Sequence, residues 1–313
     1  MVGLEVAAAI ALLIALYLVA SPRFGERAYH HALFAPWKYP VGNYHGDLGS
    51  SGRFEDVFFD AIDGKKLHGW FFQGSKNKTV LVNHGKTGNI TDLEQLMFML
   101  LDTGASVFIY DYRGFGRSEG SPSLKVICED GINAYQWLVN EKGIEPRDIV
   151  AYGESLGGIV ACHLAEQTDI GGLILQSSFS SLRKISIENM SALKYFPQSL
   201  FPIHGNNSMT LSRFKKPVLI LHGALDEDIN IQHSHELHTA ASASKEFIIL
   251  PHTLHDEIDK RDGELFVGSV TSFLENLEHT THGTMHGTTH GITHETTHEK
   301  THPAQPPVQS THT

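Results

Sequence analysis

One serine of this sequence stands where it could act as a nucleophile. It lies in the segment Gly153-Glu-Ser-Leu-Gly157, between an apolar strand-like run at 149–152 and a helical pattern at 159–165. A nucleophilic serine of this kind projects from a sharp strand-to-helix turn with strained backbone angles, so the residues two positions away must be small. Glycine occupies both of those positions. The pattern therefore predicts Ser155 as the nucleophile of an acyl-transfer reaction.

A serine hydroxyl needs a base to take its proton, and the chain has 21 histidines from which to choose. After such a turn, the order expected along the chain is serine, then an acid, then a histidine behind the last strand. The last strand-like run precedes His252 and His255, and we assign His255 because its loop position lets the ring reach back over the sheet edge. The run before it precedes Asp226 and Asp228, and we assign Asp226 as the carboxylate that orients the histidine. His252 and Asp228 are the alternatives.

Acyl transfer also requires hydrogen-bond donors for the oxyanion that forms during the reaction, and backbone amides can supply them. The amide of Leu156 follows the nucleophile at the start of a helix. The loop Asn83-His-Gly-Lys-Thr87 follows another strand-like run and offers the amide of Lys86, with Gly85 allowing a close approach of the backbone. We therefore predict Lys86 and Leu156 as the oxyanion donors.

Positioning these residues requires an α/β fold, and residues 54–277 alternate strand-like with helical runs. Asp63-Gly64 predicts a hairpin between the first two strands, and unbroken apolar runs predict strands buried on both faces of a mostly parallel sheet. Thr91 with Glu94 predicts a helix start, and the irregular stretch 180–216 predicts a small cap. The eight predicted strands are 54–61, 67–73, 80–82, 107–110, 149–152, 173–175, 218–221 and 247–250.

The first 22 residues are strongly apolar. No charged side chain occurs from Val6 to Pro22, a run at the short end of the roughly 17–25 residues that a spanning helix needs. We predict a single-pass membrane anchor at 1–22, with a cleaved signal peptide as the alternative. Basic residues follow the run and none precedes it, which predicts a cytoplasmic catalytic domain. Residues 23–53 are predicted to be a linker.

Beyond residue 277 the composition changes to a repeat rich in Thr, His and Gly. We predict that residues 278–313 are disordered, because this composition cannot build a core. Imidazole is a common ligand of zinc, nickel and copper, so the histidines are candidate weak metal sites, and a repeat without a selected role is the alternative. The histidines are spaced four residues apart: His282, His286, His290, His294, His298 and His302.

Charge and cysteine content limit the classes of function. The net charge is −11, and no cluster of Lys and Arg interleaved with aromatic residues occurs, so nucleic acid is not an expected partner. Cys128 and Cys162 have no metal-like spacing and are predicted to be free buried thiols. We therefore expect no metal in the catalytic domain and no cofactor.

A longer motif, Asp111-Tyr-Arg-Gly-Phe-Gly-Arg-Ser-Glu-Gly-Ser-Pro122, extends the pattern. Together with the serine turn and Asp63-Gly64, it resembles the α/β-hydrolase superfamily over residues 54–277, and in particular its serine-aminopeptidase-like branch, which includes membrane-tethered lipases and acyl-protein thioesterases. The resemblance implies an α/β-hydrolase fold. It also implies a serine hydrolase that cleaves a carboxylic ester or thioester of a lipid-derived or acylated substrate through an acyl-enzyme intermediate.

Two other functions stay open at this point. An amidase or aminopeptidase would use the same triad and would need an acidic pocket residue for the substrate amine. A non-catalytic binding protein on the same fold would not need the triad at all. Lys86 departs from the resemblance, because relatives often carry Asn or an apolar residue there, although the backbone donor is unaffected.

Overall fold

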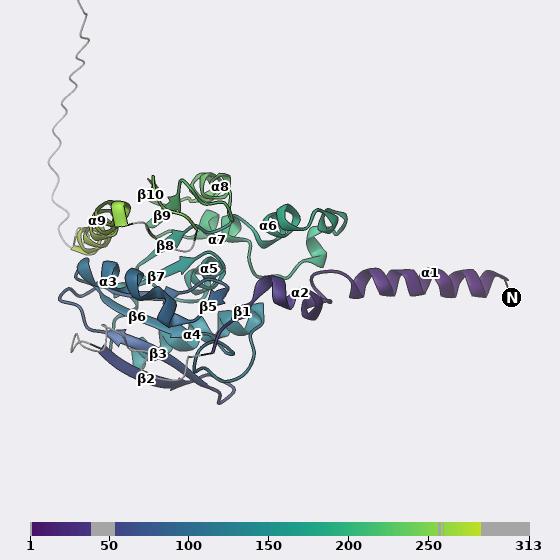
Figure 1. Cartoon of the computed structure of the whole chain (residues 1–313), viewed down its shortest axis with the longest axis horizontal. Helices are drawn as coiled ribbons and strands as arrows, with labels where there is room; N and C mark the ends of the chain where they lie inside the picture. The colour runs from purple at the N-terminus through teal and green to yellow at the C-terminus, as the bar shows by residue number, and fades with distance from the viewer. Residues whose placement is uncertain (1, 39–53, 256–257, 259, 283–313) are drawn as a thin grey trace, which may run out of the picture.

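An eight-stranded sheet forms the centre of the molecule (Figure 1). The computed structural model describes residues 2–38, 54–255, 258 and 260–282. The strand order is β10-β9-β8-β7-β4-β6-β3-β2, and β3 alone runs in the direction opposite to the other seven strands. The strands are β2 (Phe54–Asp60), β3 (Lys66–Phe72), β4 (Thr79–Asn83), β6 (Ser106–Asp111), β7 (Ile149–Glu154), β8 (Gly172–Gln176), β9 (Val218–Gly223) and β10 (Lys245–Leu250). The predicted eight-stranded, mostly parallel sheet is confirmed.

Helices cover both faces of the sheet, so its middle strands are buried along their whole length. On one face, α4 (Leu124–Asn140), α5 (Gly157–Gln167) and α8 (Gln232–Ala240) pack onto a large apolar cluster. On the other, α3 (Glu94–Asp102) and α9 (Gly263–His282) pack onto a second cluster. This two-sided burial is why the strands are continuously apolar in sequence. Two short 3₁₀ helices, η3 (Pro146–Asp148) and η6 (Lys260–Asp262), lie in connections.

The start of α3 differs from the prediction. A 3₁₀ turn, η2 (Ile90–Leu93), precedes the helix, and the capping box is formed by Asn89 and Asp92. The Asn89 side chain accepts from the Thr91 amide at 2.9 Å, and the Asp92 carboxylate accepts from the Asn89 amide at 2.9 Å. Asn is as good an N-cap as Thr, so the sequence alone could not separate two overlapping boxes.

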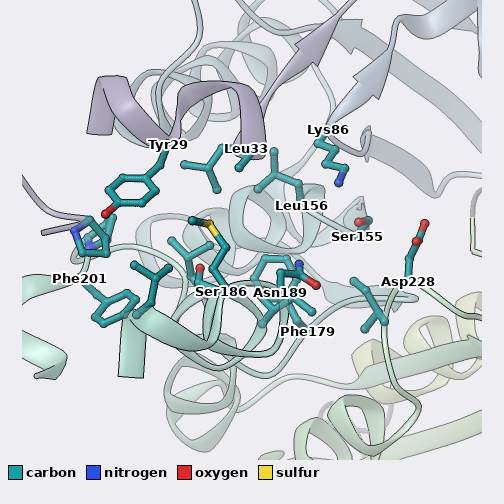
Figure 2. Close-up of a pocket in the computed structure, with 18 of the residues that line it drawn as sticks. Tyr29, Leu33, Lys86, Ser155, Leu156, Phe179, Ser186, Asn189, Phe201 and Asp228 are labelled. Carbon is teal, nitrogen blue, oxygen red and sulfur yellow. The ribbon is translucent and has the colours of Figure 1, made fainter. Parts of the chain in front are cut away.

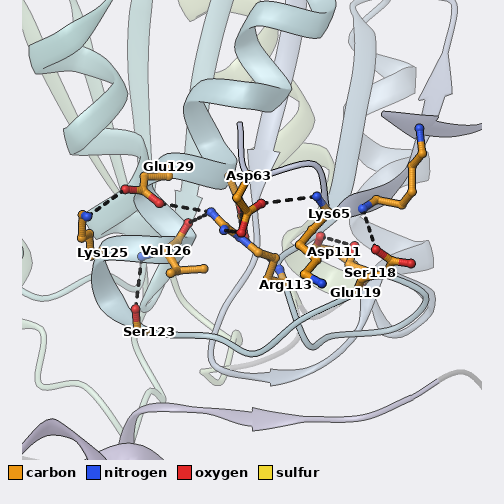
Figure 3. A network of polar contacts seen from close by, with 12 residues as sticks. Asp63, Lys65, Asp111, Arg113, Ser118, Glu119, Ser123, Lys125, Val126 and Glu129 are labelled. Carbon is orange, nitrogen blue, oxygen red and sulfur yellow. Dashed lines mark hydrogen bonds and ion pairs between the residues drawn. The ribbon is translucent and has the colours of Figure 1, made fainter. Parts of the chain in front are cut away.

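Arg113 of the motif Asp111–Pro122 connects the turn between β2 and β3 with α4 (Figure 3). Its guanidinium donates to Asp130 at 2.7 Å, to Asp63 at 2.7 Å and to Glu129 at 3.2 Å. Asp63 belongs to the predicted hairpin, in which Gly64 has a positive φ of 77°. Burial raises the pKa of Asp130 to about 6, although its bonds with Arg113 act in the opposite direction. The motif is therefore a structural clamp between the hairpin and α4.

The stretch 180–216, which the sequence analysis interprets as a cap, follows β8 as a series of short helical elements. They are α6 (Leu182–Asn189), η4 (Ser191–Tyr195), η5 (Gln198–Leu200) and α7 (Asn207–Arg213). The side chain of Ser181 caps α6 by accepting from the Lys184 amide. Pro197 and Pro202 flank η5 and interrupt any longer helix. We refer to residues 180–216, with these elements and the segments between them, as the cap.

The N-terminal segment forms two helices, α1 (Val2–Val19) and α2 (Glu26–Leu33), of which α1 projects from the domain in Figure 1. The prediction of a single-pass membrane anchor is wrong. Within the described part of the chain, no helix combines the length and the apolarity that a membrane span requires. With 18 residues α1 is at the lower limit of the length that a spanning helix needs, and one of those residues is Glu5 in its first turn. The cytoplasmic location inferred from that anchor is withdrawn with it.

Part of the predicted linker is bonded to the domain. After α2, the short strand β1 (Ala35–Pro36) pairs in parallel with β5 (Thr87–Gly88). The amide of Ala35 donates to the carbonyl of Lys86 at 2.8 Å. The segment after α2 therefore holds the loop that carries one predicted oxyanion donor. The tail from residue 283, with five of the six spaced histidines, lies outside the described residues, as does the side chain of His282.

Candidate active site

Ser155 lies at a strained turn between β7 and α5. Its φ is 51°, a left-handed conformation that residues with a side chain rarely adopt. The turn is tight enough to require glycine on both sides. A Cβ atom at Gly153 would lie 2.6 Å from the Gly157 carbonyl oxygen, and a Cβ atom at Gly157 would lie 2.0 Å from the Asn83 carbonyl oxygen. The Ser155 amide donates to the carbonyl of Gln176 at 3.0 Å, which fixes the strained backbone.

Three side chains that are distant in sequence form one line of hydrogen bonds. The Oγ atom of Ser155 lies 3.0 Å from Nε2 of His255, and Nδ1 of the same ring lies 2.9 Å from Oδ2 of Asp226. A carboxylate can only accept, so the imidazole carries its proton on Nδ1 and leaves Nε2 free to accept from the serine hydroxyl. The arrangement is able to remove a proton from Ser155 and pass it to another group.

The Asp226 carboxylate is held by more than the histidine. Its Oδ1 atom accepts from the amides of Asp228 at 3.0 Å and Ile229 at 2.8 Å, while its Oδ2 atom faces His255. Burial acts to raise the pKa of Asp226, but the bonds from His255 and Ile229 and the nearby His222 together hold that pKa below its usual range. The side chain has no solvent exposure. Asp226 therefore remains a fixed negative acceptor beside the imidazole.

The alternative acid and histidine have other positions. His252 is engaged elsewhere, since its Nδ1 atom bonds with Asp262 at 2.8 Å and its side chain is 43% exposed. Asp228 lies on the rim of the cavity beside Ser155, while the carboxylate oxygen that bonds Nδ1 of His255 belongs to Asp226. The geometry therefore brings together Ser155, Asp226 and His255, the three residues predicted to act together.

Both predicted oxyanion donors border the space in front of the serine. Lys86 and Leu156 line the same cavity as Ser155 and His255. Among the backbone contacts of the described residues, neither amide donates to another backbone group, so both are free to donate to a new partner. The amide of Leu156 also lies at the N-terminus of α5, which begins at the next residue, and the partial positive charge of a helix N-terminus favours a negatively charged oxygen there.

Two cavities meet at Ser155 and His255. The first has a volume of about 300 Å³ and lies between the cap and the N-terminal segment (Figure 2). Figure 2 shows Ser155, Lys86 and Asp228 at one end of it, and Tyr29 and Phe201 at the other. The second, of about 370 Å³, lies over the loop after β4. It is more polar, with Lys86, Thr87, Asp92, Gln95 and Asp228 in its lining.

Among the described residues of the domain, one group of potential metal ligands occurs, where none was expected. Cys128, His163 and His204 come from α4, α5 and the loop before α7, and their ligand atoms lie within 4.8 Å of one another. These donor types suit zinc, but burial raises the pKa of the Cys128 thiol well above its usual range, so a metal would have to displace that proton. Residues so far apart in sequence give no spacing signal.

The residues that the sequence analysis missed belong to the cavity walls. Pro22 and the α2 residues Tyr29, Ala32 and Leu33 form one side of the first cavity. They lie in or next to a segment predicted to be a linker. The amphipathic pattern of α2 spans only two turns, which is too short for periodicity to identify a buried face.

Comparisons with known proteins agree with this architecture. A family profile described as serine aminopeptidase, S33, matches residues 74–211. The uncharacterized protein Rv2307c of Mycobacterium tuberculosis is 31% identical over 222 residues, which cover 70% of this chain and 78% of that protein. The α/β-hydrolase domain-containing protein WAV2 of Arabidopsis thaliana is 30% identical over 246 residues, covering 71% of this chain and 79% of that protein.

A solved structure shows the same fold at lower sequence similarity. The esterase Pf2001 of Pyrococcus furiosus superimposes with a TM-score of 0.64 over 77% of this chain and 98% of that chain, at 23% identity. At that level of identity the likeness concerns the fold and leaves the chemistry to be argued from the site.

Proposed function

This chain belongs to the α/β-hydrolase superfamily, and from that premise we propose that it is a serine hydrolase that cleaves a carboxylic ester or thioester through an acyl-enzyme intermediate. The Ser155 hydroxyl attacks the carbonyl carbon while His255 takes its proton. The amides of Lys86 and Leu156 donate to the oxyanion that forms. His255 then gives the proton to the leaving oxygen or sulfur, and the bond to the leaving group breaks.

The second half of the reaction repeats these roles with water. His255 takes a proton from a water molecule, the resulting hydroxide attacks the acyl carbon, and Ser155 leaves with the proton that His255 returns. Asp226 stabilises the imidazolium in both halves. The observation that carries this proposal is the unbroken line from the Asp226 carboxylate through His255 to the hydroxyl of a strained serine.

The cavity beside the serine supports a substrate with an apolar acyl group. Leu182, Ile185, Leu193 and Phe201 of the cap line this space, and the volume of about 300 Å³ lies in the range of pockets that hold small organic ligands. We therefore propose a lipid-derived or otherwise acylated substrate.

An aminopeptidase or amidase is the second candidate. The exposed carboxylate of Asp228 borders both cavities at Ser155 and is the kind of group that would bind a substrate amine. Lys86 lines the same rim and would oppose a cation there. Hydrolysis of aminoacyl p-nitroanilides faster than of p-nitrophenyl esters would favour this candidate.

Covalent labelling tests the nucleophile. The full-length protein should react with a fluorophosphonate probe and hydrolyse p-nitrophenyl esters, and Ser155→Ala should abolish both. Ser186 provides a matched control, because it is a serine that lines the same cavity. The hydroxyl that bonds with Nε2 of His255 belongs to Ser155 instead. Ser186→Ala should keep the labelling. Labelling of Ser155→Ala at the wild-type rate would refute the proposal, and no labelling of the wild-type protein would favour a non-catalytic binding protein.

A further inference from the structure

The N-terminal segment is a wall of the cavity that opens at the proposed nucleophile. Pro22, Tyr29, Ala32 and Leu33 border it on one side. In Figure 2, Tyr29 and Leu33 stand opposite the cap residues Ser186 and Phe201, with the cavity between them. The family profile begins only at residue 74, so this wall is built by a part of the chain that the profile does not include.

Specific contacts fix this wall to the rest of the molecule. The Arg23 amide donates to the carbonyl of Leu200 at 2.9 Å, and its guanidinium donates to the carbonyl of Ser199 at 3.0 Å. The Tyr17 hydroxyl donates to a carbonyl of η4 at 2.7 Å. At the other end of α2, the Phe34 side chain is only 1% exposed and belongs to the main core. The segment is thus attached both to the cap and to the sheet domain.

The two cavities differ in polarity, and this difference indicates which half of an ester substrate each one would hold. The first is lined mainly by aliphatic and aromatic side chains from the cap and α2. The second contains Asp92, Gln95 and Thr87. An ester with an apolar acyl chain and a polar leaving group matches this division, because burial of apolar surface is favourable while a polar group loses hydration unless it finds hydrogen-bond partners.

We propose that the cavity between the cap and α2 binds an unbranched apolar acyl chain, and that the N-terminal segment sets the chain length that the enzyme accepts. The inference rests on the proposed function and names its substrate class. The carbonyl lies at Ser155, the chain runs between the cap and α2, and Tyr29 with Phe201 closes the far end.

The test compares p-nitrophenyl acetate with p-nitrophenyl octanoate on the full-length protein. The octanoate has six more methylenes than the acetate, and each methylene that is buried raises kcat/KM by up to about fourfold. For the wild type, kcat/KM should therefore be higher for the octanoate by at least about a hundredfold, which requires burial of only three to four of the six. Ala32→Trp should lower the octanoate-to-acetate ratio by at least about tenfold, equivalent to roughly two lost methylenes. Ala32 is exposed on α2 and lines the cavity, so the larger side chain projects into the acyl space.

Ala28→Trp is the matched control. Ala28 is an exposed alanine one turn earlier on the same helix and does not line the cavity, so its ratio should stay at the wild-type value. Met190→Trp, at a cap position that is 44% exposed and borders the cavity from the opposite side, gives the same readout if Ala32→Trp does not fold.

The outcomes separate the two proposals. A folded Ala32→Trp protein with the wild-type octanoate-to-acetate ratio, or a wild type that prefers acetate, would refute the inference that the N-terminal segment sets the acyl-chain length. The proposed ester hydrolysis would be unaffected by either result. A wild-type protein that hydrolyses neither ester and resists the fluorophosphonate would overturn the proposed function, and the inference would fall with it.

Discussion

Replacing Asp226 with asparagine tests the proton assignments at the site. The two amides that bond Oδ1 require an acceptor, so the carbonyl oxygen of the new side chain must take the Oδ1 place and its NH₂ group the Oδ2 place. That NH₂ group then faces Nδ1 of His255. Two donors cannot bond each other, and the ring must move its proton to Nε2. Nε2 can then no longer accept from Ser155.

The expected loss of kcat is large because the imidazole is then in the tautomer that cannot accept the serine proton, although the three side chains keep their positions. A change of this kind lowers kcat by about 10⁴-fold, or ~5.5 kcal/mol of transition-state stabilisation. The measurement is kcat for a p-nitrophenyl ester at neutral pH, with thermal unfolding to show that the variant folds. The side chain keeps its two amide bonds, so the melting temperature should change far less than the activity.

Two neighbours serve as controls for this prediction. Glu227→Gln removes an exposed carboxylate from the same loop and should leave kcat at the wild-type value. Asp228→Asn alters the cavity rim and should reduce kcat less than tenfold. A kcat above a tenth of the wild-type value in Asp226→Asn, or an equal loss of kcat in Asp228→Asn, would refute the proton assignments at the site.

Two further predictions concern the scaffold. Gly157→Ala places a Cβ atom 2.0 Å from the Asn83 carbonyl oxygen and should abolish both probe labelling and cooperative folding. Gly268→Ala, in α9, places a Cβ atom with no other atom within 4 Å and should raise the free energy of unfolding in urea by about 0.5–1 kcal/mol. Equal stability of the two variants would contradict this prediction. Burial lowers the pKa of His84, so the native state favours the neutral ring and loses stability as the pH falls below the unfolded value of about 6.5. When the pH is lowered from about 7.5 to about 5.5, the free energy of unfolding should therefore fall less for His84→Asn than for the wild type, by up to ~1.4 kcal/mol. Urea unfolding at the two pH values measures both losses, and an identical loss would show that His84 does not titrate on unfolding.

The sheet was predictable largely because its middle strands are buried on both faces and are therefore continuously apolar. Each of the eight strands coincides with a predicted strand, and the observed bounds differ from the predicted ones by at most two residues. The turn that carries Ser155 was predictable for a local steric reason, since Gly153 and Gly157 are required by contacts within the turn itself. His255 and Asp226 followed from chain order, and their distances to each other could come only from the fold.

The N-terminal region was not predictable in the same way. An uncharged run indicates apolarity but not the length of the helix that forms, and no helix among the described residues is long and apolar enough to cross a membrane. The wall formed by α2 depends on bonds such as that from the Arg23 guanidinium to Ser199, which join residues 176 apart. No periodic pattern encodes a contact at that separation.

The bonds of Arg23 to the cap have a consequence for folding. The bond from its guanidinium to Ser199 joins residues 176 apart, a larger separation than in the strand pairs of the sheet, of which β4 with β7 spans the most, and contacts that close longer loops form later because chain entropy opposes them. We expect the sheet and its helices to assemble first and the N-terminal segment to dock last. A protein arrested before that step would have native-like circular dichroism and yet hydrolyse esters without regard to chain length, so substrate selectivity would report the final stage of folding.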